Sequence, residues 1–285
     1  MKRYLRALAL LLCLLTVLLP LTSCGGGDTR DVVAVTIPPV AEFVRAISGE
    51  DFRIVTLVPP GYSPEAYEPT VRTMMDFADA RAFFSMGLPV DEATLIPAIS
   101  EGTRHLSLSE VVAELYPERT IDGGRDPHIW LSPSRVTVMV NAIAAELAAL
   151  RPERAEMYAE NAETYLSQLS AVDAAVDAAI SASGITEFIV YHPAFGYFAD
   201  EYGLTMHALE EHGSEATAAE MTALVDFARE RDIRVIFYQA ETDGRQAKAF
   251  AREIDGVAVK LSPLAEDYLE NLEEMAAAIA SAKGD

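Results

Sequence analysis

From residue 31 onward, short apolar runs alternate with amphipathic segments along the chain. Seven runs have the length of strands, and several are apolar at every position, as strands buried on both faces are. They lie at 31–37, 53–58, 82–87, 187–192, 204–209, 235–240 and 256–262, and helical segments lie between them at 39–48, 71–80, 217–231 and 244–254. This alternation in both halves predicts an α/β fold with parallel sheets and right-handed crossovers.

The middle of the chain, 134–183, has no strand pattern and predicts two helices. Pro152 separates a helix over 134–150 from a longer one over 153–183, and Gly184 is a natural stop. The longer helix has one apolar stripe at spacings of three and four, formed by Tyr158, Ala162, Tyr165, Leu169, Val172, Val176 and Ile180. About 31 residues at 1.5 Å each give roughly 46 Å. That length exceeds the needs of one small lobe, so we interpret the helix as a rigid strut.

These elements predict two Rossmann-like α/β lobes joined by one long helix. The expected boundaries are an N-terminal lobe at 31–150, a linking helix at 151–184 and a C-terminal lobe at 185–285. The length of 285 residues fits about two ordinary domains. In open parallel sheets, ligands bind beyond the carboxyl ends of the strands, so a site is expected in the cleft between the lobes.

Residues 1–23 are predicted to be a secretory signal, since basic MKRYLR precedes apolar ALALLLCLLTVLLPL. A transmembrane anchor is the alternative, but Pro20 breaks the apolar run, which ends at Cys24. LTSC resembles the lipobox of bacterial lipoproteins, which implies cleavage before Cys24 and acylation of its thiol. An ordinary signal peptide with a chance cysteine is the other reading. Residues 24–30 would form a flexible lipidated tether, holding an extracytoplasmic protein at the cell membrane.

Cysteine content and charge narrow the chemistry. The only cysteines are Cys13 and Cys24, so the mature fold has no disulfide and no thiolate metal site, and any metal is held by nitrogen and oxygen. Without the three basic residues of the leader, 19 of 22 basic residues remain against 44 acidic ones, a net charge of −25. That sign argues against nucleic acid and favours the approach of cations, although solubility alone also explains it.

Ligand-type side chains follow several predicted strands. Glu65 and Glu68 follow the second run, His192 ends the fourth, and Gln239, Glu241 and Asp243 follow the sixth. A further candidate, His128, lies in a Gly/Pro-rich loop with the only tryptophan, Trp130. Two imidazoles with one or two carboxylates suit zinc, and also manganese or iron.

Each of these residues also has an ordinary interpretation. His192 could be a core or capping histidine, His128 a surface histidine, and Glu65 and Glu241 solvated carboxylates. His105 and His207 belong to predicted strands, and His212 in EEHGSE is expected to be exposed. HALEEH has the wrong spacing for a zinc-protease helix.

Four motifs together resemble the zinc/manganese class of ABC-transporter substrate-binding lipoproteins. They are LVPPGYSPEAYEPT, DPHIWLSP, YHPAFGYFADEYGL and VKLSPLAEDYLENLEEM, and the resemblance covers nearly all of the mature chain. It implies two α/β lobes joined by one long helix, a metal between the lobes, and hand-over to a membrane permease driven by an ATPase.

The resemblance carries ligands over only where residues match. The family's histidine in DPHIWLSP is His128, and His192 matches the position that holds histidine in zinc binders and commonly glutamate in manganese binders. Glu65 stands where the family usually has histidine, and Ser262 where it usually has aspartate. Neutral serine is a poor ligand, so Glu241 is the candidate fourth donor, with Asp243, Gln239 or a water as alternatives. The His-rich loop of many zinc members is absent.

The predicted function is therefore capture of a divalent transition metal and delivery to an ABC permease. Zinc is the first choice because of His192, and manganese the alternative because of Glu65. We expect a monomer with no enzymatic activity, since no general base or nucleophile constellation accompanies the ligands. A zinc hydrolase and a surface adhesin are the remote alternatives.

Overall fold

The computed structural model describes residues 30–121, 123–210, 216–242 and 244–282. The predicted leader, Cys24 and most of the tether lie outside these residues, as do His212 and Asp243. Residues 31–285 form one compact unit, which is described below. No helix among the described residues is long and apolar enough to cross a bilayer.

The first lobe is built on a four-stranded parallel sheet. Its strands are β1 (Val32–Val35), β2 (Arg53–Thr56), β3 (Ala80–Ser85) and β4 (Arg104–Ser107), in the order β2-β1-β3-β4. Every residue of β1 is buried because the strand is central and wholly apolar. Helices α2 (Pro38–Ser48), α3 (Val71–Ala78) and α4 (Leu108–Ala113) belong to this lobe, and β5 (Thr120–Ile121) pairs with β6 (Gly124–Arg125) in a short hairpin.

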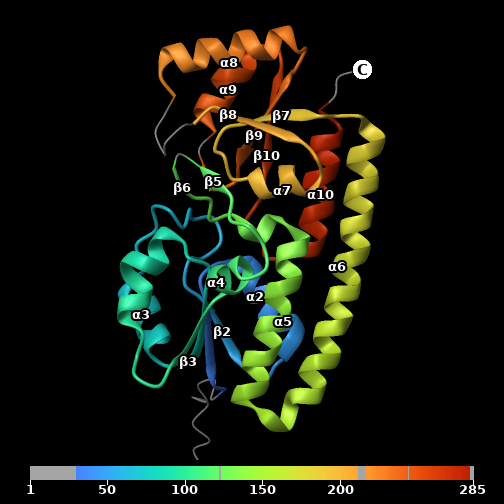
Figure 1. Ribbon diagram of the computed structural model, residues 1–285. Helices are drawn as coiled ribbons and strands as arrows, with labels where there is room; N and C mark the ends of the chain where they lie inside the picture. The colour runs from blue at the N-terminus through green and yellow to red at the C-terminus, as the bar shows by residue number, and fades with distance from the viewer. Residues whose placement is uncertain (1–29, 122, 211–215, 243, 283–285) are drawn as a thin grey trace, which may run out of the picture. The chain divides into compact units, whose positions relative to one another are not determined.

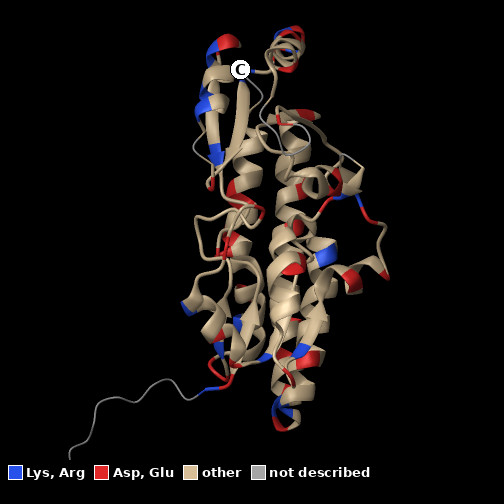
Figure 2. Cartoon of the chain, turned by 90° about the vertical axis from the view of Figure 1, so that its left-hand side faces the viewer, with Lys and Arg blue, Asp and Glu red and all other residues tan. Residues whose placement is uncertain are grey.

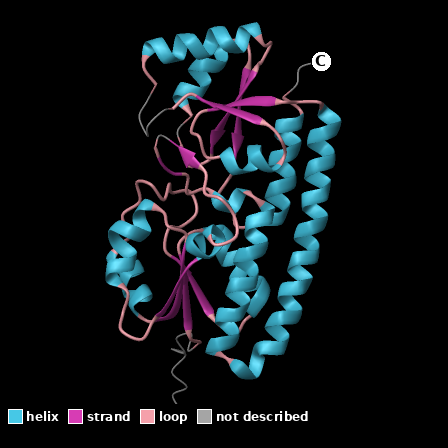
Figure 3. Ribbon diagram, in the orientation of Figure 1, coloured by secondary structure: helices cyan, strands magenta, loops and turns pink. Residues whose placement is uncertain are grey.

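The second lobe repeats this architecture with a separate sheet. Its strands are β7 (Glu187–Val190), β8 (Thr205–Ala208), β9 (Val235–Gln239) and β10 (Val257–Leu261), all parallel, in the order β10-β9-β7-β8. Its helices are α7 (Gly196–Glu201), α8 (Ala218–Glu230), α9 (Arg245–Glu253) and α10 (Tyr268–Ala280). The two groups of strands are separate in Figure 3. The prediction of two parallel-sheet α/β lobes is confirmed.

Helices α5 (Pro133–Leu150) and α6 (Ala155–Ser183) occupy the middle of the chain, as predicted. Six residues of the α6 stripe are buried, and the seventh, Val172, packs half-buried against the same core. The helix ends at Gly184, which has a left-handed φ of 63° that glycine adopts without strain. In Figure 1, α6 runs alongside α5 and α10 and joins the lobes.

One hydrophobic cluster extends through both lobes. It includes Val33 of β1, Leu169 of α6, Phe198 of α7, Phe237 of β9 and Leu272 of α10. A smaller cluster packs α8 and α9 on the second sheet. The loops that follow β2 and β7 meet, since Glu65 and His192 lie 3.1 Å apart.

The structure corrects several boundaries. The strands are shorter than the apolar runs, so β7 ends at Val190 and His192 lies two residues beyond it, in a bend. Elements outside the predicted set are α4, α10 and the hairpin strands β5 and β6, whereas the strand expected at His105 is present as β4. β4 is an edge strand with polar, exposed Arg104 and His105, so it lacks the apolar pattern that marks the central strands.

Candidate metal centre

Glu65 is brought to the cleft by the loop that follows β2. Its backbone N–H donates to the Ser63 hydroxyl at 3.3 Å, within a turn closed by Ala66 N–H to Ser63 C=O. Ser63 and Pro64 are residue types that favour such a turn. The Glu65 side chain is 38% exposed, so its carboxylate reaches the cleft from the solvent side.

His128 comes from the same lobe and is oriented by a buried carboxylate. Asp126, which is fully buried, accepts from the backbone N–H of His128 at 3.0 Å and contacts Nδ1 of the ring at 2.8 Å. Because an ionised carboxylate only accepts, Nδ1 carries the proton and Nε2 is left to bind a metal. Trp130 packs against the ring at 5.3 Å between centroids.

His192 comes from the second lobe and has an equivalent partner. Its Nδ1 lies 2.8 Å from Oε2 of Glu210, which follows β8. Its Nε2 is buried and lies 3.1 Å from Oε1 of Glu65, outside hydrogen-bond geometry, without a hydrogen-bond partner among the described residues. Both imidazoles therefore present Nε2 toward the same carboxylate.

The three side chains converge on one point. One ligand atom each of Glu65, His128 and His192 lies within 4.8 Å of the others, and His128 Nε2 is 3.7 Å from Glu65 Oε1. Atoms bound tetrahedrally to one zinc at about 2.0–2.1 Å are separated by distances of this order. Two imidazoles and a carboxylate with an open fourth position form a donor set that zinc accepts.

The charges of the site depend on one another. Burial alone would lower the pKa of His192, but the carboxylates of Glu210 and Glu65 outweigh it and raise that pKa to about 9. Burial raises the pKa of Glu65, but His192 and His128 outweigh it and lower that pKa below its ordinary value. Without metal, the cluster is held together by a protonated imidazole beside a carboxylate.

Glu241 lies beside the cluster without belonging to it. It lines a small cavity of about 10 Å³ together with Glu65, His128 and Gln239. Its Oε2 is buried and makes no hydrogen bond within the described part of the chain, and burial raises its pKa. The cavity is about the size of one water, so it fits either a carboxylate moving toward a metal or a bridging water.

Among the described residues, Ser262 makes backbone hydrogen bonds rather than contacts with the candidate metal ligands. Its backbone carbonyl accepts from Asn271 at 2.8 Å, and the neighbouring carbonyl of Pro263 accepts from the Trp130 indole at 2.8 Å. The LSPL turn therefore braces the loop of His128.

The cluster also lines a groove of about 1030 Å³. Its lining includes Glu65, Glu92, His192 and Glu210, and Arg125 is the one Lys or Arg among the described lining residues. Ribbon positions occupied by Asp and Glu, red in Figure 2, occur in both lobes. This excess of negative charge attracts cations toward the groove.

Two functional carboxylates were missed by sequence reasoning. Asp126 stands two residues before His128, and Glu210 follows the strand next to β7. The rule that used strand ends to find His192 would also have selected Glu210, since β8 ends at Ala208. For Asp126 the signal was its place in the DPH motif, because an aspartate side chain can hydrogen-bond the backbone two residues further on.

Comparison with known protein families shows which family the chain belongs to. The family model described as ZnuA, zinc-uptake complex component A periplasmic, matches residues 33–282. The chain belongs to this family. The resemblance inferred from the four motifs is thereby confirmed.

Individual ZnuA-family relatives agree with this assignment. Zinc-binding protein AdcA of Streptococcus pyogenes serotype M3 is 28% identical over 261 residues, covering 81% of this chain and 50% of AdcA. The chain thus spans about half the length of the AdcA relatives it matches. A putative metal-binding protein of Chlamydia muridarum is 26% identical and covers 88% of this chain and 91% of its own length.

Solved structures share the fold of this chain. A crystal structure of ZnuA is 30% identical, with a TM-score of 0.84 over 90% of this chain and 100% of that one. The periplasmic zinc-binding protein TroA from Treponema pallidum is 22% identical, with a TM-score of 0.82 over 89% of this chain and 99% of TroA, and shows the fold alone.

Proposed function

We propose that this ZnuA-family protein captures Zn²⁺ outside the cytoplasm and delivers it to an ABC permease for import. The observation that carries the proposal is the convergence of Glu65, His128 and His192 within 4.8 Å. Relatives described as zinc-binding proteins support the choice of metal. Membership of a family of uptake-complex components supports transport rather than catalysis.

The proposed ligand set takes Glu65 and His128 from the first lobe and His192 from the second. Glu241 or a water in the adjoining cavity would complete four-coordination. Residues 31–150, 151–184 and 185–285 would act as lobe, linking helix and lobe, which places the metal between two parts of the chain that could separate for release.

Binding measurements on metal-stripped protein test the function. We expect one Zn²⁺ per chain, bound more tightly than Mn²⁺ in a two-metal competition, and severe weakening in His128→Ala and His192→Ala because too few donors remain. His207→Ala is the matched control, since His207 pairs with Glu187 away from the site. Zinc binding of parental strength in either site variant would refute the ligand set, and a preference for Mn²⁺ would select the alternative metal.

Attachment to the membrane is the remaining part of the proposal. Cleavage before Cys24 and acylation of its thiol would tether the folded body to the cell membrane, where a permease receives the metal. Cys24→Ser should move the protein from the membrane to the soluble extracytoplasmic fraction. A variant that stays membrane-bound would contradict the lipid anchor but would leave metal capture intact. Hydrolase assays on the zinc-loaded protein should show no turnover.

A further inference from the structure

The helix that follows His192 packs directly on the segment that leads to His128. Helix α7 begins at Gly196, four residues after His192, and Arg119 belongs to the other lobe. A Cβ atom on Gly196 would lie 2.0 Å from Nε of Arg119, so the Arg119 side chain rests on the bare glycine backbone. The backbone N–H of Arg119 also donates to the Tyr197 hydroxyl at 2.9 Å.

The Arg119 side chain also contacts the carboxylate that orients His128. Its Nε donates to Oδ2 of Asp126 at 3.1 Å, while Oδ1 of the same carboxylate holds Nδ1 of His128. Its guanidinium also lies 3.5 Å from Asp200 on α7. One side chain therefore connects the carboxylate behind His128 to the helix behind His192.

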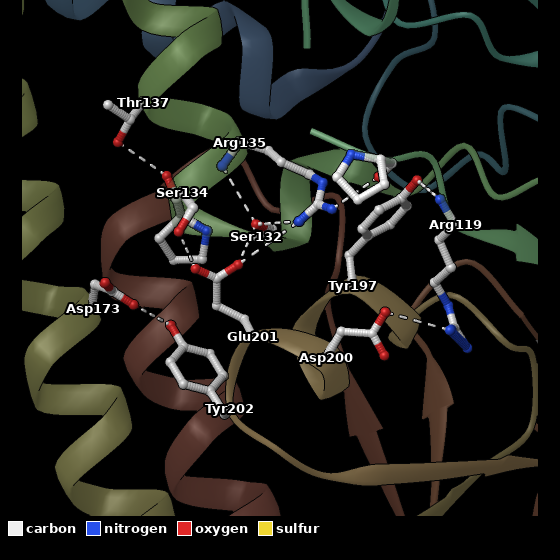
Figure 4. A network of polar contacts seen from close by, with 12 residues as sticks. Arg119, Ser132, Ser134, Arg135, Thr137, Asp173, Tyr197, Asp200, Glu201 and Tyr202 are labelled. Atoms are coloured by element: carbon white, nitrogen blue, oxygen red, sulfur yellow. Dashed lines mark hydrogen bonds and ion pairs between the residues drawn. The ribbon is translucent and has the colours of Figure 1, made fainter. Parts of the chain in front are cut away.

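The other end of α7 is fixed at the start of α5. The Glu201 carboxylate accepts from the hydroxyls of Ser132 and Ser134, the N-cap and the second residue of that helix. The guanidinium of Arg135 stacks on the Tyr197 ring at 4.5 Å. Figure 4 shows these side chains gathered between the elements, so α7 cannot shift without breaking several contacts at once.

The network also reaches α6. The Tyr202 hydroxyl, one residue beyond α7, donates to Asp173 of α6 at 2.8 Å. With Glu201 and Tyr202 held, the Gly196 end of α7 is placed against Arg119 by the packing on Gly196 and by the Tyr197 hydroxyl. The Arg119–Gly196 contact is therefore the spacer between the two histidine segments.

We propose that Arg119, seated on Gly196, is a positioning residue that sets the separation of His128 and His192 and so selects Zn²⁺ over Mn²⁺. The inference rests on the proposed function. Donors held close together suit zinc, which accepts four ligands at about 2.0–2.2 Å. A looser cluster would admit additional waters, and manganese tolerates the resulting higher coordination number with oxygen ligands.

Two substitutions change the seat from opposite lobes. Gly196→Ala adds a methyl group where Nε lies, leaves every charge in place, and is compatible with the α7 backbone because the φ of Gly196 is not positive. Arg119→Lys keeps the charge but removes the planar group that reaches Asp126 and Asp200 together. Gly124→Ala, whose Cβ would meet only a carbonyl at 3.7 Å, and Arg154→Lys, whose partner Asp51 is in the first lobe away from the cleft, are the matched controls.

The readouts are zinc and manganese affinities in competition, the rate of zinc loss to a chelator, and the visible spectrum of the Co²⁺-loaded protein. We expect both Arg119→Lys and Gly196→Ala to lower the zinc-to-manganese affinity ratio by about 10- to 100-fold, the usual cost of disturbing groups that orient metal ligands. Zinc loss should accelerate, and the intense spectrum of four-coordinate Co²⁺ should weaken toward that of a six-coordinate ion. Both controls should match the parent.

Particular results would overturn the inference. If Arg119→Lys lowers the ratio and Gly196→Ala does not, Arg119 acts only within its own lobe and the spacer role is wrong. Equal loss of both metals with an unchanged Co²⁺ spectrum would mean a purely structural contact. These outcomes presuppose that the parent binds zinc and that His192→Ala does not, so failure of the proposed function would be recognised separately.

Discussion

Glu65 is the residue whose chemistry departs furthest from the zinc-binding pattern of the motifs. Its carboxylate lies near Nε2 of both histidines, so the position reaches the metal centre although the residue type is unusual. A carboxylate is a harder donor than imidazole and suits manganese better. We therefore expect residue 65 to set part of the metal selectivity of this site.

We expect Glu65→His to raise zinc affinity relative to manganese, because imidazole is the softer donor. A two-metal competition measures the change. Glu68→His is the control, since Glu68 is an exposed residue of the same loop. An unchanged preference in Glu65→His would mean that residue 65 does not contact the ion.

Glu241→Gln tests the fourth position. If Glu241 binds the metal, the substitution should weaken zinc binding by about 1–3 kcal/mol, by analogy with other charged hydrogen-bonding partners. The loss should shrink as pH falls, because protonation removes the same donor from the parent. Isothermal titration of both proteins, with exposed Glu230→Gln as the control, gives the comparison, and full affinity in Glu241→Gln would assign the position to a water.

The raised pKa of His192 makes zinc binding depend on pH. Below its folded-state pKa of about 9 the metal-free imidazole is protonated, and zinc must displace that proton. Apparent affinity should thus rise with pH toward 9 and then level off, with close to one proton released near neutrality. Calorimetry in buffers of different ionisation enthalpy measures the release, which should be absent for residue 192 in His192→Ala.

The same pKa affects the stability of the metal-free protein. The folded value lies above the ordinary value of 6.5, so the stabilisation is fully present below 6.5 and is lost as pH rises through about 9. Urea unfolding across this window should show metal-free protein weakening with rising pH. The His192→Ala variant should lack this part of the pH dependence.

At the scale of elements, the metal centre depends on where strands and helices end. His192 and Glu210 each follow the carboxyl end of a parallel strand, β7 and β8, so adjacent strands place ligand and partner side by side. The end of α6 matters as well, because the helix ends at Gly184 and the chain then turns into β7.

Replacing Gly184 tests that stop. Gly184→Ala should lower the free energy of unfolding by about 1 kcal/mol, since a side chain disfavours the left-handed conformation that Gly184 adopts. Gly184→Asn should cost less, because asparagine tolerates this conformation. Urea titration compares the two, and equal stability of Gly184→Ala and the parent would show that the chain finds another way to leave the helix.

At the scale of the whole described unit, the two lobes share one hydrophobic core. The cluster runs from the first sheet through α6 and α7 to Phe237 of the second sheet. Burial on this scale couples the lobes during unfolding, so they should melt together rather than in succession. A ligand bridging them would then stabilise both.

Zinc should raise the melting temperature of the protein in one cooperative transition. For zinc at about 100 times its Kd, binding to the folded state alone adds about 2.7 kcal/mol. Differential scanning calorimetry with and without zinc gives the shift, and His128→Ala should lose most of it. Two separate transitions, only one of them sensitive to zinc, would contradict a shared core.

The sequence by itself determined the fold class, the long helix and the main ligand candidates. Apolar runs alternating with amphipathic segments are local signals, and the stripe of α6 together with Gly184 is readable from spacing alone. His128 and His192 were predicted to be site residues because imidazoles at loop and strand ends are few and chemically distinctive. Edge strand β4 was expected only as a strand starting at His105, without an apolar run, because pairing with one neighbour leaves its residues free to be polar.

Only the tertiary structure decided how these residues meet. Asp126, Glu210 and Arg119 are ordinary charged residues in the sequence, and their roles come from distances of about 3 Å to groups remote along the chain or folded back by a turn. The separation between His128 and His192 depends on how α7 seats against the first lobe, which no local pattern encodes. The residue types in the sequence indicated metal chemistry, whereas packing between the lobes set the geometry of the site.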